Sequence, residues 1–169
     1  MVLFPKEFKC SRSLQKTIRN GPYTTHLDRD FAATIRACAA PRRSGADTWL
    51  GAAMIAAYQE LHTLGFAHSI ETYDADRLVG GLYGVHLGGV FFGESMFSTQ
   101  RDASKVALQR LVHECASRHI HMIDCQVASE HLQSLGAREV SRAEFTLLLR
   151  NWARIEPSSP WSAAPGEIA

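Results

Sequence analysis

Apolar side chains recur at the spacing of an α-helix in the first third of the chain. Residues 28–39 carry an apolar residue at every third or fourth position, with Asp28 or Asp30 as the N-cap, which predicts a short helix. A longer helix is predicted to begin at Asp47 or Thr48. Its apolar stripe comprises Leu50, Met54, Tyr58 and Leu61.

The pattern then changes to the alternation that is typical of β-strands. Three strands are predicted over 67–74, 77–85 and 89–97, and the short turns between them indicate an antiparallel meander. Glycines inside strands mark bulges or places where another group approaches the backbone closely. Such glycines stand at Gly80, Gly81, Gly84 and Gly93.

The helical period returns over residues 102–119, and a strand is expected over 120–127. A short helix at 129–135 follows, and Ser141 with Glu144 forms the capping box of a last helix. The predicted order is two helices, three strands, a helix, a strand and two helices. We expect an α+β fold class with a central, mostly antiparallel sheet flanked by helices, in the acetyltransferase-like (GNAT-like) arrangement.

The chain of 169 residues is long enough for one domain with its own core. We expect this domain over 1–152 and a flexible, Pro/Ser/Ala-rich tail over 153–169. The net charge of +1 does not indicate a nucleic-acid-binding protein by itself.

The first 25 residues differ from the rest in having no strong hydrophobic period. Over 1–22, five basic residues stand against Glu7 alone, which gives a local net charge of +4. We expect a basic arm over 1–25 that follows phosphates, with a solvated and partly loose terminus as the alternative. The basic residues are Lys6, Lys9, Arg12, Lys16 and Arg19.

The spacing of cysteines and histidines excludes the common metal and disulfide patterns. Four cysteines stand at positions 10, 38, 115 and 125 without a CxxC pair, and no HExxH is present. We interpret His62 and His68 as structural and expect no metal and no cofactor. The longest apolar stretch, 78–93, is too short to span a membrane. A cytoplasmic, monomeric protein fits these features.

An acetyl-CoA enzyme of the expected fold needs a glycine-rich turn at the N-terminus of the helix after the third meander strand. The corresponding stretch here, FSTQRDASK, contains no glycine. Arg101 and Lys105 could contact a phosphate, but the turn that lets a pyrophosphate approach the backbone is missing. Acetyl-CoA is therefore a weak candidate.

The predicted strand IHMIDCQV ends in an acid, a cysteine and an amide. Strand alternation places Asp124 and Gln126 on one face, and places Cys125 on the apolar face that packs on the helix. Cys125 is therefore expected to be a core residue. Glu94 is a further polar residue in an apolar strand of the same sheet, and burying such groups is costly unless they bind each other or a ligand. These residues predict a cleft for a ligand with polar and apolar parts.

Eight sequence blocks in register resemble the leucyl/phenylalanyl-tRNA–protein transferase family. The resemblance covers about residues 3–150. The blocks are TW (48–49), AYxxLHxxGxAHSIE (57–71), LVGGLYGV (78–85), FxGESMFS (91–98), ASKxAL (103–108), IDCQ (123–126), HLxSLGA (131–137) and SRxxF (141–145).

The resemblance implies an aminoacyltransferase on an acetyltransferase-like fold. Members of the family move Leu or Phe, and less often Met, from aminoacyl-tRNA to the α-amino group of proteins that begin with Lys or Arg, which marks those proteins for N-end-rule degradation. Family members usually carry a further N-terminal region ahead of the equivalent of VLFP. An alternative is therefore a shortened, non-catalytic module that binds tRNA or the N-terminal residue.

The resemblance also implies roles for individual residues. Asp124 and Gln126 act on the incoming amine, with Gln126 as the group that orients it and Asp124 as the negative charge. Glu94 holds the cationic N-terminal residue or the tRNA terminus, and Trp49 stacks on the terminal adenosine. The positions that match the family's hydrophobic pocket are Leu82, Phe91, Met96, Leu108, Leu111 and Cys115.

Two of these pocket positions have opposite strand parity. Phe91 and Met96 are five residues apart in one predicted strand, so a regular strand would direct them to opposite faces. Both reach one pocket only if the strand contains a bulge, which we expect near Gly93. Leu111 and Cys115 replace aromatic residues of some relatives, which predicts a roomier pocket.

Overall fold

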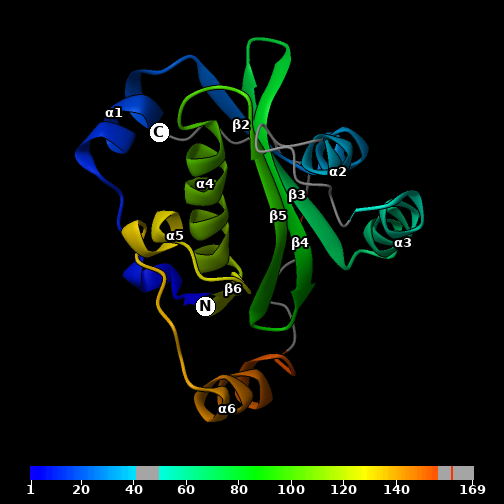
Figure 1. Cartoon of the computed structure of the whole chain (residues 1–169), viewed down its shortest axis with the longest axis vertical. Helices are drawn as coiled ribbons and strands as arrows, with labels where there is room; N and C mark the ends of the chain where they lie inside the picture. The colour runs from blue at the N-terminus through cyan, green and yellow to red at the C-terminus, as the bar shows by residue number, and fades with distance from the viewer. Residues whose placement is uncertain (41–49, 156–160, 162–169) are drawn as a thin grey trace.

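The computed structural model describes residues 1–40, 50–155 and 161, and its centre is one six-stranded mixed sheet (Figure 1). The strand order is β1-β6-β5-β4-β3-β2. All neighbouring strands are antiparallel except β5 and β6, which are parallel. The strands are β1 (Val2–Leu3), β2 (Tyr23–Leu27), β3 (Ala67–Asp74), β4 (Arg77–Leu87), β5 (Val90–Ser98) and β6 (Met122–Asp124).

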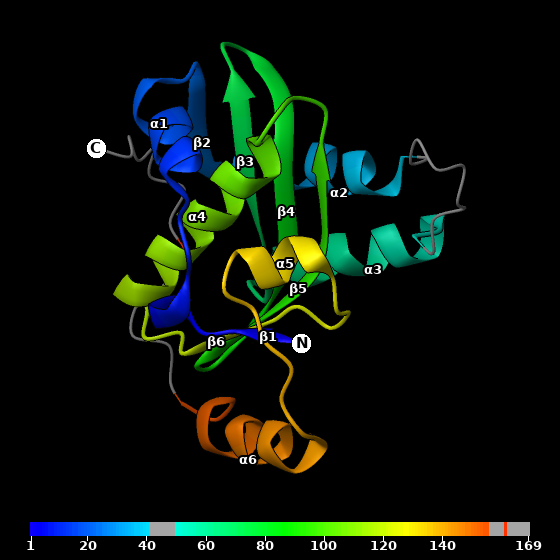
Figure 2. The ribbon, with the colours of Figure 1, turned by 60° about the vertical axis from the view of Figure 1, so that its left-hand side comes forward.

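Helices cover both faces of this sheet. Figure 1 shows α4 (Ala103–Ser117) on one face and α2 (Phe31–Ala39) with α3 (Ala52–Thr63) on the other. Figure 2 shows α1 (Arg12–Asn20) beside α4, and α6 (Arg142–Trp152) beyond the end of the sheet where β1 and β6 lie. The remaining elements are a 3-10 helix (Pro5–Glu7) and α5 (Glu130–Ser134). The expected α+β class and mostly antiparallel sheet are confirmed.

The meander is the part of the fold that the hydrophobic pattern predicted best. β3 has the predicted bounds, and β4 and β5 differ from theirs by one or two residues. Asp30 is the N-cap of α2 and accepts a hydrogen bond of 2.7 Å from the Ala33 N–H. Ser141 caps α6 as expected, with the Glu144 N–H donating to its hydroxyl at 3.1 Å.

Close packing leaves no room for a side chain at two glycines of β4, one against α4 and one against β5. A Cβ added at Gly80 would lie 2.6 Å from the Cβ of Ala103, at the start of α4. A Cβ added at Gly84 would lie 2.1 Å from the Phe92 carbonyl oxygen and 2.5 Å from the Phe91 ring. These glycines therefore serve packing within the chain.

The expected bulge is present in β5. Tyr83 of β4 pairs with Ser95 and the next residue, Gly84, pairs with Gly93, so Glu94 is the extra residue. Phe91 and Met96 consequently pack in the same cluster, on the α4 face of the sheet. The prediction that a bulge near Gly93 reconciles their parity is confirmed.

The N-terminal segment is folded, although the sequence predicted no helix or strand there. It forms β1, the 3-10 helix, α1 and β2, and Val2, Leu3 and Leu14 are buried. The Ser11 hydroxyl caps α1 by accepting from the Leu14 N–H at 3.2 Å. The apolar face of α1 is narrow, which is why the sequence shows little periodicity.

The start of helix α3 and the length of strand β6 also differ from the predictions. Helix α3 begins at Ala52 with Gly51 as its N-cap, so Asp47 and Thr48, which lie outside the described residues, do not open it. Leu50 lies outside the helix, and Met54 of the predicted stripe is exposed.

Strand β6 contains only Met122–Asp124 of the predicted strand 120–127. Cys125 still donates its N–H to the Met1 carbonyl at 3.0 Å, but Gln126 has a positive φ of 60° and ends the extended backbone. Val127 was expected on the apolar face and is 73% exposed.

Substitution of Gly84 by alanine should destabilise the fold, because the added methyl group overlaps backbone and the Phe91 ring. We expect a loss of about 1–3 kcal/mol in the free energy of unfolding, measured by urea denaturation with an unchanged m-value. Gly51→Ala is the matched control, since a Cβ there meets nothing within 4 Å. A loss of stability at Gly51 equal to that at Gly84 would contradict the packing argument.

Candidate active site

The polar residues predicted from the sequence meet where β6 ends beside β5. Asp124 pairs with Phe92 of β5, and a Cβ at Gly93 would lie 3.4 Å from the Asp124 carbonyl oxygen. Gln126 follows two residues after Asp124, and Glu94 follows Gly93. We call Glu94, Asp124 and Gln126 the polar corner. No described strand pairs with β5 beyond Phe92 on this side, so the corner lies at a free sheet edge.

Asp124 holds the backbone of Gln126 in place. Its Oδ1 accepts the Gln126 N–H at 2.9 Å, which is an Asx-type turn. Asp124 is half-buried and Gln126 is exposed. Within the described part of the chain, Asp124 forms no ion pair, so its negative charge has no fixed partner.

Glu94 faces α3. Tyr58 of α3 forms a side-chain hydrogen bond with Glu94, and burial together with this bond raises the pKa of the Tyr58 phenol. Tyr58 therefore stays protonated and donates to the carboxylate. Its ring also contacts Tyr83, with centroids 5.2 Å apart. Tyr58 was predicted only as a core residue, and its role beside Glu94 was missed because it depends on the packing of α3.

The six predicted pocket residues lie together in one apolar cluster between the sheet and α4. Five of them are buried, and Met96 is half-buried at the free edge of β5. The cluster contains Leu82, Phe91, Met96, Leu108, Leu111 and Cys115.

The apolar cluster and the polar corner lie on opposite faces of the sheet. Ile123 packs in the apolar cluster, whereas its neighbour Met122 packs on the other face of the sheet. Asp124 faces the same side as Met122, because side chains alternate along a strand. Glu94 also faces away from α4, because it forms a hydrogen bond with Tyr58 of α3, the helix on the other face of the sheet in Figure 1. Beyond Phe92, where β6 has ended, no further described strand pairs with this edge of β5.

Cys125 is a weak nucleophile in this environment. Burial, followed by the charge of Asp124, raises the pKa of its thiol to about 11. The thiolate is the reactive form, so the side chain is almost entirely unreactive near neutral pH. Cys125 packs against the α4 cluster, in agreement with the strand-face prediction.

Trp49, predicted to stack on adenosine, lies outside the described residues. The turn before α4 also differs from a nucleotide-binding loop. Asp102 binds Lys105 at 2.7 Å and Arg101 at 3.5 Å, so both candidate phosphate ligands have a carboxylate partner.

Asp28, His62 and His68 form a group whose ligand atoms lie within 4.8 Å of one another. Hydrogen bonds already occupy this group. His68 Nδ1 lies 2.8 Å from the Asp28 carboxylate and its Nε2 lies 3.1 Å from the Gly65 carbonyl. His62 Nδ1 lies 2.8 Å from the Ala67 carbonyl. Asp28 also accepts the Ser69 N–H at 2.7 Å, so the group links β2, α3 and β3.

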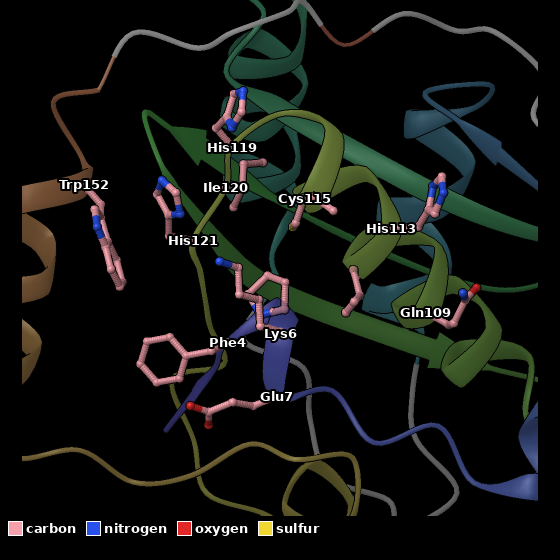
Figure 3. Close-up of a pocket in the computed structure, with 13 residues that line it drawn as sticks. Phe4, Lys6, Glu7, Gln109, His113, Cys115, His119, Ile120, His121 and Trp152 are labelled. Carbon is pink, nitrogen blue, oxygen red and sulfur yellow. The ribbon is translucent and has the colours of Figure 1, made fainter.

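A separate cavity of about 640 Å³ lies between the N-terminal segment, the C-terminal half of α4 and α6 (Figure 3). His113, His119 and His121 line it, but Figure 3 shows them spread along its wall without a common centre. Of the six predicted pocket residues, only Cys115 also lines this cavity. The cavity is therefore distinct from the polar corner.

No helix in the described ranges is both long enough and apolar enough to cross a membrane.

Residues 2–150 match the family model for leucyl/phenylalanyl-tRNA protein transferase. Proteins of that name from three bacteria are similar to the chain. The one from Nitrosospira multiformis is 56% identical over 89% of this chain, the one from Chromobacterium violaceum 49% over 95%, and the one from Syntrophobacter fumaroxidans 50% over 95%. The chain spans only 65% to 70% of the length of these relatives.

Thiol labelling tests the assignment of Cys125 as a packed residue. At pH 8, we expect Cys125 to react with iodoacetamide much more slowly than a free cysteine, because its pKa of about 11 leaves little thiolate. Site-resolved mass spectrometry after timed labelling measures this rate. Labelling after unfolding in urea is the control, and rapid labelling of Cys125 in the folded protein would contradict its burial.

Proposed function

Because the chain belongs to the leucyl/phenylalanyl-tRNA–protein transferase family, we propose that it moves an apolar aminoacyl group from tRNA to a protein. The donors are Leu-tRNA and Phe-tRNA, and Met-tRNA less often. The acceptor is the α-amino group of a protein that begins with Arg or Lys, and the product enters N-end-rule degradation in the cytoplasm. The observation that carries the proposal is the polar corner at a free sheet edge, with the apolar cluster on the opposite face of the same sheet.

The reaction needs few groups from the protein. The acceptor amine, in its neutral form, attacks the ester carbonyl; the C–N bond forms, the C–O bond to the tRNA ribose breaks, and a proton passes from nitrogen to the leaving hydroxyl. Because the ester is already activated, positioning and charge stabilisation supply most of the catalysis. A covalent enzyme intermediate is unnecessary, which agrees with the high pKa of the Cys125 thiol.

Asp124 and Gln126 suit the acceptor amine. An amine that approaches as an ammonium ion is attracted by the unpaired carboxylate of Asp124. The Asx turn holds the Gln126 backbone N–H 2.9 Å from that carboxylate, so the exposed Gln126 side chain begins beside it. Gln126 then orients the amine, and Asp124 supplies the negative charge that polarises it.

Glu94 suits the cationic side chain of the acceptor's first residue or the tRNA terminus. Its hydrogen bond with Tyr58 holds the carboxylate on the α3 side of β5. A carboxylate at this position favours Arg or Lys over neutral residues by charge. The apolar cluster on the α4 side selects the donor by shape and buried area.

The basic residues of the N-terminal segment suit the tRNA backbone. Lys16 and Arg19 are exposed on α1, and Arg12 stands at its first turn. Lys6 and Lys9 are exposed in the segment that leads to α1. The segment is folded onto α4, so these charges form a fixed surface. We also infer that the sheet and its flanking helices follow the acetyltransferase-like (GNAT-like) arrangement.

Removal of the Asp124 charge tests the catalytic proposal. Asp124→Asn keeps an oxygen that accepts the Gln126 N–H but removes the negative charge. We expect transfer of radiolabelled leucine from Leu-tRNA to an Arg-initiated peptide to fall by about 100-fold or more. Cys125→Ala is the matched neighbour and should keep activity within about threefold.

A large loss of transfer activity in Cys125→Ala together with a small loss in Asp124→Asn would overturn the assignment of the polar corner. Binding of uncharged tRNA or Arg-initiated peptide by the unaltered chain, without any transfer, would instead indicate the non-catalytic binding module.

Salt dependence tests the tRNA surface. Each phosphate contact contributes slightly less than one unit to the slope of log K against log salt concentration. Lys16→Gln and Arg19→Gln should therefore each weaken tRNA binding and reduce the slope by about 1. Arg150→Gln is the control, because Arg150 is exposed on α6, which Figure 2 shows at the opposite end of the molecule from α1. An equal effect of Arg150→Gln would contradict the assignment of the surface to α1.

A further inference from the structure

Trp161 lies well beyond α6 in sequence, yet its side chain is half-buried against the apolar cluster. The family match ends at residue 150, so this residue comes from outside the matched region. The sequence predicted a flexible tail over 153–169, and the described position of Trp161 shows that at least this side chain is held.

Two histidines at the ends of β3 and β4 hold the indole. The Trp161 ring stacks on the His68 ring with centroids 4.5 Å apart and an interplanar angle of 11°. The Trp161 Nε1–H donates to His86 Nδ1 at 2.8 Å, and His86 Nε2 lies 2.7 Å from the Gly88 carbonyl. Burial lowers the pKa of His86, so the ring is neutral near pH 7 and accepts this bond.

The last turn of α4 supplies a third contact. The Arg118 guanidinium lies 4.9 Å from the centre of the Trp161 ring, within the range of a cation–π interaction. Arg118 is buried and pairs with the buried Glu114 on the same helix. The indole is therefore fixed by a stacked ring, a hydrogen bond and a buried cation, each from a different element.

The fourth neighbour of Trp161 is Phe91, with ring centroids 5.8 Å apart and an interplanar angle of 41°. Phe91 belongs to the predicted pocket and lies over Gly84, where a Cβ would be 2.5 Å from its ring. The sheet closes one side of the Phe91 ring and Trp161 contacts it from another. Cys115, one turn of α4 before Arg118, is a small side chain in the same cluster.

We propose that Trp161 is a positioning residue of the side-chain pocket, which fixes the Phe91 ring and thereby sets which aminoacyl side chain is accepted. This inference rests on the proposed transferase function and adds to it a specificity residue from outside the matched region. Without Trp161, the Phe91 ring can move away from the pocket, and the pocket becomes deeper and less defined. A small donor side chain such as Leu then loses contact area, while Phe still fills the space.

Steady-state kinetics with Leu-tRNA and Phe-tRNA test the proposal. For Trp161→Ala we expect KM for Leu-tRNA to rise about tenfold, with kcat nearly unchanged and a smaller rise for Phe-tRNA. Trp161→Phe keeps an aromatic ring on His68 and should restore most of the preference. An unchanged ratio of Leu to Phe transfer in Trp161→Ala would overturn the proposal.

Trp152→Ala is the matched control. Trp152 is also half-buried, but it packs with Val2, Val90 and Met122 in a different cluster. Its substitution should leave the Leu to Phe ratio within about twofold even if stability falls. An equal change in this ratio for both tryptophans would show that the effect is general destabilisation and would overturn the proposal.

Fluorescence separates this inference from the proposed function. The chain has three tryptophans, so a double variant with Trp49→Phe and Trp152→Phe leaves Trp161 as the only tryptophan that fluoresces. We expect acrylamide to quench it weakly, and Phe91→Ala, but not Met54→Ala on the surface of α3, to increase quenching. If the unaltered chain transfers no amino acid, the specificity role falls with the proposed function. Strong quenching in the otherwise unaltered protein would instead overturn the docking of Trp161.

Discussion

One extra residue in β5 determines how the site is built. Glu94 forms a bulge opposite β4, and this single insertion resets the alternation of side chains along the strand. Phe91 before it and Met96 after it both face α4, so the apolar cluster contains residues that a regular strand would separate. The bulged residue, Glu94, turns its side chain to the other face, where the Tyr58 hydroxyl donates a hydrogen bond to its carboxylate. The same insertion therefore completes the apolar cluster and places an acid on the opposite side.

The close approach of α4 to the sheet makes this arrangement possible. Gly80 and Gly84 leave room for the helix and for the Phe91 ring, and the helix then returns the chain to form β6 parallel to β5. Because β6 stops at Asp124 while β5 continues to Ser98, the polar residues stand at the place where the sheet narrows.

Local patterns in the sequence predicted the local parts of the fold. The three meander strands have strong alternation and short turns, and their bounds were correct within two residues. Helix α1 and β1 escaped prediction because their burial comes from distant partners, as Leu14 and Val2 show. The polar corner was expected from Asp124 and Gln126, but the strand was predicted too long, since the positive φ of Gln126 has no signal in the residue type. Trp161 could not be placed because its four contacts come from β3, β4, β5 and α4.

The edges of the sheet limit how another polypeptide can meet Asp124. An unpaired strand edge is a template on which an extended chain adds by main-chain hydrogen bonds. β1 offers no such template, because Val2 exchanges hydrogen bonds of 2.9 and 2.8 Å with Arg138 on its outer side. Between Gly93 and Ser98, however, β5 has no strand partner among the described residues on the side where β6 has ended. This part of β5 is the stretch of the sheet edge next to Asp124 on which an extended segment could add by main-chain hydrogen bonds.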